Sequence, residues 1–239
     1  MRRHHTFRSD RRGTLGLLAR RMAMGGAAWV FCAPAWAGPE GERVVAGSAS
    51  FTRAGDLTTI RASNNTIINY QSFNIARPET VQFVQPSAAS RVLNRITGAD
   101  PTQIAGSLIA NGIVYIVNPA GVYFRQGALV NVAQIYASAA HLADKDFARG
   151  VNRFTGVSGD VVNEGTINAG ATAMVGQHVV NAGTINSPAG TVTMMAGNDV
   201  LVGQHGSSVY VRVGSVTPDV EGGSSARSEE RRVGKECRL

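Results

Sequence analysis

Two closely spaced aspartates are the strongest candidate for a catalytic group in this 239-residue chain. Asp144 and Asp146 form an Asp-x-Asp pair, and enzymes that cleave polysaccharides place two carboxylates near each other as acid and base or nucleophile. The other carboxylates between residues 38 and 226 are scattered, so no third group joins this pair. We expect Asp144 and Asp146 to lie in a solvated turn, and a polysaccharide-acting surface enzyme is kept as the alternative.

Histidines and cysteines could bind a metal, but their spacing argues against such a site. His178 and His205 each follow a Gly-Gln pair, whereas a zinc site needs three or four ligands close together. We interpret the two Gly-Gln-His segments as related surface turns of a repeat. The only cysteines, Cys32 and Cys237, lie near opposite ends of the chain, so the body needs no disulfide. The sequence thus predicts no catalytic residue, no metal and no cofactor.

Short repeated strands are the elements that would position these side chains. Residues 161–169 (VVNEGTINA) return as residues 179–187 (VVNAGTINS), with seven of nine positions identical at a spacing of 18. Such a unit cannot bury a core alone, so successive units must wind into a coil and stack. This predicts an all-β fold, a right-handed, single-stranded parallel β-helix with an N-terminal cap. A β-propeller is the competing repeat fold, but its units are about twice as long.

The stacking also predicts the role of individual residues. The expected inward aliphatic column consists of Val162, Ile167, Val180 and Ile185. Asn163 and Asn181 should occupy equivalent turns and hydrogen-bond each other, and the glycines that follow them should supply positive φ. The apolar run 113–117 should be a strand buried on both faces. Residues 38–226 should make about nine coils, with strands within 44–60 capping the first edge.

The net charge of +7 comes from the two ends of the chain. Residues 1–37 hold seven Arg and one Asp, and residues 227–239 hold five basic and three acidic residues. The body between them, residues 38–226, has 11 basic and 12 acidic side chains and no basic cluster. This balance argues against a nucleic-acid partner.

Residues 1–37 have the pattern of a secretory signal peptide. An arginine-rich start precedes an apolar stretch, residues 22–34, that is too short to span a membrane. Ala35-Trp36-Ala37 is typical of a cleavage site. Two Arg pairs leave a twin-arginine route open, although general secretion fits better, and an uncleaved anchor is a further alternative. We expect no transmembrane segment elsewhere in the chain.

Three consecutive segments resemble a known family. Residues 81–98 (VQFVQPSAASRVLNRITG) lead through residues 100–108 (DPTQIAGSL) to residues 110–124 (ANGIVYIVNPAGVYF). Together they resemble the haemagglutination-activity, or two-partner secretion, domain of filamentous haemagglutinin and related adhesins. The resemblance covers nearly the whole body of the chain.

The resemblance points to two groups of signature positions. Asn118, Pro119 and Gly121 match the family motif Asn-Pro-Asn-Gly-Ile, Val122 is a conservative change, and Ala120 replaces the second Asn. Asn, Pro and Gly in this order also predict a β-turn, with or without contact to a transporter. The family's Asn-Pro-Asn-Leu motif does not occur here. The second group of signature positions comprises Gln85, Pro86, Ser87, Leu93, Asn94 and Arg95.

What the resemblance implies is export through the periplasm of a double-membrane bacterium to the cell surface or the medium. The implied partner is an outer-membrane β-barrel transporter whose periplasmic POTRA domains bind the secretion domain. After passage, the domain would template the β-helix that follows it. Host-cell or surface glycans are further candidate ligands. A stand-alone structural β-helix of the cell envelope is the remaining functional alternative.

The predicted organisation is a signal peptide (1–37), the β-helix secretion domain (38–217), a linker (218–226) and a tail (227–239). The tail breaks both the repeat and the charge pattern, and it resembles a translated sequencing adapter. We interpret it as the non-native end of a truncated reading frame. A charged, disordered C-terminus is the alternative interpretation.

Overall fold

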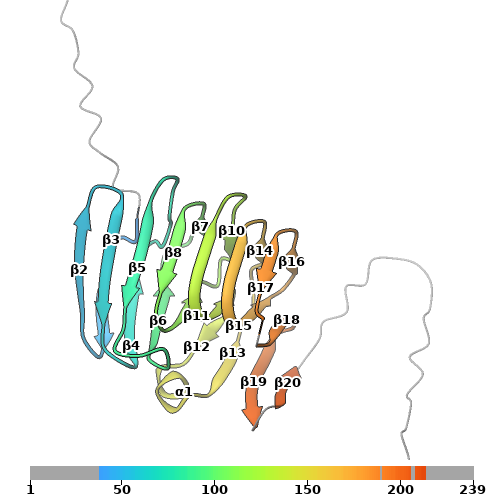
Figure 1. Ribbon diagram of the computed structural model, residues 1–239. Coiled ribbons are helices and arrows are strands. Elements are labelled where there is room, and N and C mark those ends of the chain that lie inside the picture. Colours follow the sequence, from blue (N-terminus) through green and yellow to red (C-terminus); the bar gives the residue numbers. More distant parts are fainter. Residues whose placement is uncertain (1–37, 189, 206–207, 214–239) are drawn as a thin grey trace, which may run out of the picture. The chain divides into compact units, whose positions relative to one another are not determined.

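A computed structural model describes residues 38–188, 190–205 and 208–213, and these form a parallel β-helix (Figure 1). The chain divides into two units, residues 1–35 and 36–239, and all described residues belong to the second. The predicted signal peptide, linker and tail lie outside the described residues. Within the described part, no helix is long and apolar enough to cross a membrane.

Each coil passes through up to three strand faces, and strands of successive coils pair in parallel. The first face contains β3 (Leu57–Ala62), β5 (Thr80–Val84), β8 (Ser107–Ala110), β11 (Leu129–Ser138), β15 (Thr166–Gly176) and β17 (Thr184–Asn186). The second face contains β4 (Thr66–Tyr70), β6 (Arg91–Ile96), β9 (Ile113–Val117), the ends of β11 and β15, and β18 (Val192–Ala196). The third face contains β7 (Thr102–Ile104), β10 (Val122–Phe124), β14 (Val161–Asn163) and β16 (Val179–Asn181). The predicted fold class is confirmed.

The described residues make six coils, counted by the strands of the first face, so the estimate of nine was wrong. An insertion, residues 139–158, leaves the coil between β11 and β14 and contains β12 (His141–Leu142), α1 (Asp144–Arg149) and β13 (Asn152–Thr155). The insertion lengthens one coil, as the stacked asparagines show. Asn168 bonds to Asn186, 18 residues away in the next coil, but to Asn131, 37 residues away in the coil before. The insertion forms an antiparallel sheet with β19 (Asp199–His205) and β20 (Ser208–Val213).

The first edge of the coil stack is capped by two antiparallel strands. β1 (Arg43–Ala46) pairs with β4, and β2 (Ala49–Ala54) pairs with β3. Both strands therefore satisfy backbone groups that would otherwise be open to edge-to-edge pairing. This agrees with the capping role expected for strands within 44–60.

The core has two parts, one inside the coil and one between the coil and the insertion. β9 serves both, because Val114 and Ile116 belong to the inner cluster while Tyr115 and Val117 belong to the outer one. The outer cluster also includes Phe147 of α1, which is fully buried. The prediction that residues 113–117 are buried on both faces is confirmed.

The inward column differs from the predicted one in its phase on the third face. Val161 is fully buried, whereas Val162 is half-buried and Val180 is 46% exposed. The reason is Asn163, which is itself buried and donates from Nδ2 to Asn181 Oδ1 over 2.8 Å. Because side chains alternate along a strand, an inward Asn163 places Val161 inside and Val162 outside. The inward Ile167 and the asparagine hydrogen bond agree with expectation.

The glycines of the repeat are needed because the coils stack closely. The expectation that they supply positive φ was wrong. Gly165 and Gly183 have no left-handed φ. A Cβ added to Gly183 would lie 2.1 Å from the Gly165 carbonyl oxygen. Only glycine therefore lets these two backbones approach so closely.

Candidate functional site

The signature segment Asn118–Gly121 is a β-turn at the corner between β9 and β10. The Gly121 N–H donates to the Asn118 carbonyl over 2.9 Å, which closes the turn. Gly121 has φ +120, and a Cβ there would lie 2.9 Å from the Tyr123 ring. The predicted turn is thus present, and glycine is required at its last position.

The Asn118 side chain ties this turn to the preceding coil. It is fully buried, and its Nδ2 donates to the Asp100 carbonyl over 3.0 Å and to Thr102 Oγ1 over 3.1 Å. Its Oδ1 accepts from the Ala120 N–H over 3.0 Å. Every hydrogen-bonding group of the amide is engaged, so in the folded domain this side chain has a structural role.

Burial limits what the folded turn can offer a partner. Asn118, Gly121 and Val122 are buried, while Pro119 and Ala120 are half-buried. The Pro119 carbonyl already accepts from Ser158 Oγ over 2.9 Å. Only Pro119 and Ala120 of the motif are therefore accessible once the domain has folded.

The second signature group begins at another corner, between β5 and β6. Gln85 is buried, and its Nε2 donates to the Ser90 carbonyl over 2.7 Å. Ser87 and Ser90 hold the corner, because the Ser87 N–H donates to Ser90 Oγ and the Ser90 N–H donates to the Ser87 carbonyl, each over 3.1 Å. Pro86 and Ser87 are exposed at the bend.

Asn111 is a residue that sequence reasoning missed at this corner. Its Oδ1 accepts from the Gln85 N–H over 2.8 Å, and its Nδ2 donates to the Gln85 carbonyl over 2.7 Å. Gly112 follows, and a Cβ there would lie 2.6 Å from the Gln85 side chain. The Asn-Gly pair is a turn signal that could have identified this contact between coils.

Asn94 lies in the inner apolar core. It pairs in register with Ile68 and Ile116, and all three are fully buried. Its Nδ2 donates to the Tyr115 carbonyl over 3.0 Å, but its Oδ1 has no hydrogen-bond partner. A buried acceptor without a partner destabilises the folded state by about 1–3 kcal/mol.

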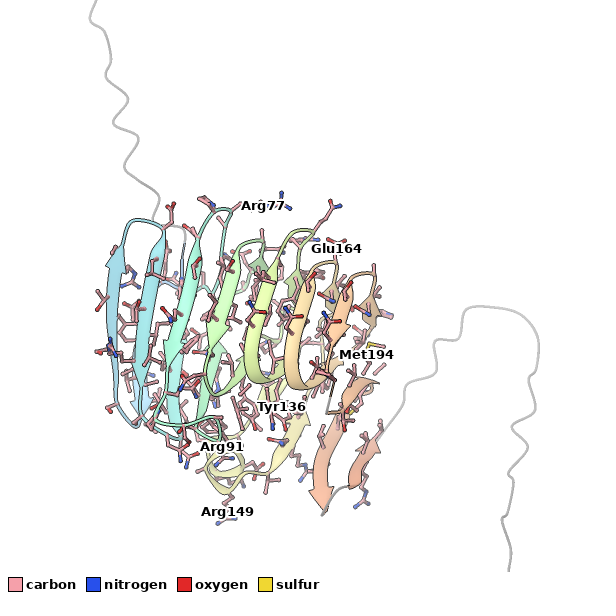
Figure 2. All side chains as sticks on the ribbon, viewed as in Figure 1. Arg77, Arg91, Tyr136, Arg149, Glu164 and Met194 are labelled. Atoms are coloured by element: carbon pink, nitrogen blue, oxygen red, sulfur yellow. The ribbon has the colours of Figure 1, made fainter. Side chains whose placement is uncertain are left out.

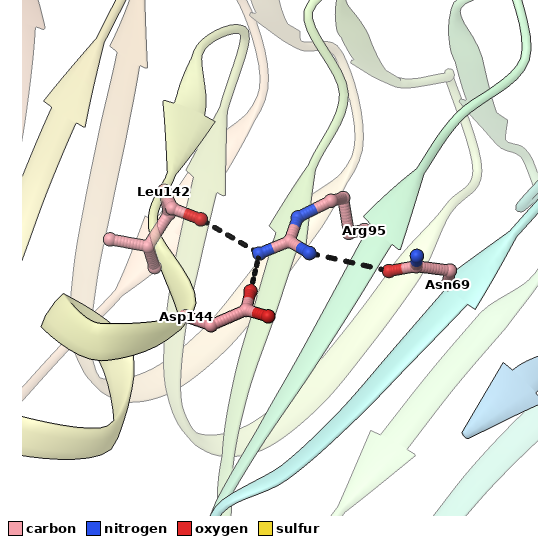
Figure 3. A network of polar contacts seen from close by, with 4 residues as sticks. All are labelled: Asn69, Arg95, Leu142 and Asp144. Carbon is pink, nitrogen blue, oxygen red and sulfur yellow. Dashed lines mark hydrogen bonds and ion pairs between the residues drawn. The ribbon is translucent and has the colours of Figure 1, made fainter. Parts of the chain in front are cut away.

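Arg95 fastens the insertion to the coil (Figure 3). Its guanidinium donates to the Leu142 carbonyl over 2.8 Å, pairs with the Asp144 carboxylate, and reaches Asn69 Oδ1 over 3.4 Å. The neighbouring Leu93 packs in the outer cluster with Phe147. Leu93 and Arg95 together hold α1 against the second face.

The signature positions do not converge on one site. Asn118–Val122 lies at the corner after β9, whereas Gln85–Ser87 lies at the corner after β5 and Arg95 faces the insertion. What the positions share is that most are buried or bonded within the fold. Their arrangement supports a coil of defined geometry.

The candidate catalytic and metal residues are separately placed. Asp144 and Asp146 lie in the first turn of α1 and not in a loop turn, and Asp144 is occupied by Arg95. His178 Nδ1 lies 2.8 Å from Asp160 Oδ1 on the surface. His205 belongs to strand β19, so the two Gly-Gln-His segments are not equivalent turns. Among the described residues, no three His, Cys, Asp or Glu form a cluster able to hold a metal.

Comparison with known proteins gives one consistent match. The TPS secretion domain model matches residues 42–232. The Heme/hemopexin-binding protein of Haemophilus influenzae is 40% identical over 135 residues, which are 54% of this chain and 15% of that protein. The chain therefore corresponds to a small part of this curated relative.

Two solved structures agree with this match. The HMW1 secretion domain from Haemophilus influenzae superposes with a TM-score of 0.67 at 28% identity, covering 74% of this chain and 49% of that chain. The filamentous hemagglutinin secretion domain has a TM-score of 0.52 at 18% identity, covering 77% and 71%, and it supports the fold alone. The chain belongs to the TPS, or two-partner secretion, domain family, whose members are exported by Gram-negative bacteria.

Proposed function

We propose that this chain is the N-terminal secretion domain of a longer adhesin-like protein, and that an outer-membrane β-barrel transporter recognises it through periplasmic POTRA domains. Residues 1–37 direct it to the periplasm. The chain then crosses the outer membrane unfolded and folds outside, where its last coil templates the next. The family match over residues 42–232 carries this proposal.

The burial of the signature turn suggests when recognition takes place. Asn118 and Val122 are inaccessible in the folded domain, so a transporter that reads these side chains must meet them before folding. Residues 38–226 contain no cysteine, so no disulfide has to form within them before passage, and parallel coils can add one at a time to the edge of the last. Both features suit passage of an extended chain.

Co-expression in a Gram-negative host tests this function. The full chain is produced with and without the POTRA-barrel protein encoded in the same genome, and the amount in the medium is measured while the cells remain intact. We expect release only with the transporter. Equal release without it would contradict the proposed partner.

A binding experiment tests the timing of recognition. Purified POTRA domains are mixed with the chain either folded or freshly diluted from urea, and complex formation is followed before refolding is complete. We expect the unfolded chain to bind more tightly, and the variant Asn118→Ala to weaken that binding. Equal binding of the folded chain would show that the buried side chains are not read.

A further inference from the structure

A groove of about 590 Å³ lies between the second face and the antiparallel sheet of the insertion. Its floor comes from residues of β9, β11, β15 and the start of β18, and one wall comes from Asn152 of β13 with Val202 and Gly203 of β19. This volume falls within the range of small-molecule sites, about 300–1,000 Å³. None of the signature residues Gln85, Asn94, Arg95 or Asn118 lines it.

Glycine lets the coils stack closely along the floor of the groove. Gly170 and Gly190 line it in adjacent coils, and a Cβ on Gly190 would lie 1.4 Å from the Gly170 carbonyl oxygen. Ala171 is the next residue on the floor, in register with Gln134. Gln134 has a long side chain, whereas Ala171 in the next coil has only a methyl group, so the groove is deeper at Ala171.

The groove lining is mostly neutral and rich in hydrogen-bonding groups. The amides are Gln134 and Asn152, and the hydroxyls include Tyr136, Thr191 and Thr193. These groups both donate and accept hydrogen bonds, which matches the hydroxyls of a sugar. Among the described residues, no Asp or Glu lines the groove.

An aromatic pair gives the groove a rigid apolar wall. Tyr115 and Tyr136 stack in successive coils with ring centroids 4.3 Å apart and an interplanar angle of 4°. Tyr115 is buried and donates to Asn152 Oδ1 over 2.9 Å, while Tyr136 remains half-buried. A fixed aromatic side chain with a polar tip can pack against the C–H face of a sugar ring and still donate a hydrogen bond.

A cation lies at one end of the groove. Arg91 lines it together with Gly150, and its guanidinium lies 5.3 Å from the centroid of the Phe147 ring. Arg91 Nη2 donates to Asn65 Oδ1 over 2.6 Å, but none of the ion pairs among the described residues involves Arg91. In Figure 2, Arg91 of β6 is labelled beside α1, and Tyr136 of β11 is labelled nearby. A guanidinium held in this way is well suited to bind a carboxylate.

We propose that this groove binds a carboxylated oligosaccharide. A pyranose ring packs against Tyr136, its hydroxyls bond to Gln134, Asn152 and the threonines, and a uronate-type carboxylate pairs with Arg91. This inference does not rest on the transporter, since the groove exists only after the domain has folded. It gives the exported domain a ligand-binding role of its own.

Saturation-transfer difference NMR on the purified full chain tests the proposal. The probes are a hyaluronan tetrasaccharide, which carries carboxylates, and chitotetraose, which is neutral. We expect saturable binding of the hyaluronan probe, weakened about tenfold by Arg91→Gln, which corresponds to roughly 1.4 kcal/mol. Binding of chitotetraose should be weaker in the wild type and unaffected by this substitution.

A groove-filling variant separates the site from nonspecific contact. Ala171→Tyr places a ring in the groove, whereas Val180→Tyr adds the same ring at a 46% exposed position on the third face. We expect Ala171→Tyr to abolish binding and Val180→Tyr to bind as the wild type, with both variants folded by circular dichroism. No saturable binding by the wild type, or unchanged binding by folded Ala171→Tyr, would overturn the proposal.

Discussion

Replacing Asn94 with leucine should stabilise the folded domain. The Asn94 side chain is fully buried between Ile68 and Ile116, and its Oδ1 has no partner. Leucine has a similar branched shape, and it removes an unsatisfied acceptor that costs about 1–3 kcal/mol. It also loses the donated bond to the Tyr115 carbonyl, which contributes about 1 kcal/mol. Adding the apolar burial that leucine gains, we expect the free energy of unfolding to rise by about 1–2 kcal/mol.

Urea denaturation followed by circular dichroism measures this change. With a slope near 2–3 kcal/mol/M for a domain of this size, the midpoint should rise by roughly 0.5 M. Asn168→Leu is a matched control, because Asn168 is half-buried and bonded to Asn131 and Asn186, so leucine there should not stabilise. A lower midpoint for Asn94→Leu would mean that the hydrogen bond to Tyr115 outweighs the unpaired oxygen, and the reasoning would be wrong.

Four further perturbations have defined outcomes. Asn118→Ala removes three hydrogen bonds, to the Asp100 carbonyl, the buried Thr102 hydroxyl and the Ala120 N–H, and should lower the free energy of unfolding by about 2–4 kcal/mol in urea titrations. Gly106→Ala brings a Cβ within 2.3 Å of two carbonyl oxygens, whereas Gly38→Ala meets nothing nearer than 3.7 Å, so only the first should lower the melting temperature. Arg95→Met should cost little global stability but should speed proteolysis within residues 139–158, since α1 loses its ion pair. The hydrogen bond from Arg153 lowers the pKa of Asp199. The stabilisation that the Asp199 carboxylate gives the fold is therefore present above the unfolded pKa of about 3.9 and is lost as pH falls through the lower folded pKa. Asp199→Asn should reduce the difference between the urea midpoints measured at high and low pH.

The repeat made the fold predictable, because residues 161–169 and 179–187 could only stack as coils. The phase of the third face was not predictable from hydrophobicity, since the buried Asn163 displaces Val162 outward. The number of coils was overestimated because an insertion has no periodic signal that marks it as leaving the helix. Its attachment through Arg95 and Phe147 depends on contacts between residues about 50 positions apart, which local patterns do not encode.

The family resemblance identified the signature residues in the sequence, but it did not predict the contacts that they make in the folded domain. Asn118 and Gln85 bond within corners, and Arg95 holds the insertion. A side chain that is buried in the folded domain cannot contact a transporter at the same time. If these residues serve both purposes, the two uses are separated in time, with recognition before folding and packing after it.

Asn94 affects the stability of the fold, and it could therefore affect how long the chain stays unfolded for recognition. An amide kept in the apolar core lowers the stability of the folded state. Under the proposed function, in which the chain crosses the outer membrane extended, slower or later folding would favour export. If Asn94→Leu both raises the urea midpoint and reduces transporter-dependent release, the unpaired oxygen acts to keep the chain export-competent. If release is unchanged while stability rises, folding does not compete with export, and the presence of Asn94 in the signature must have another reason.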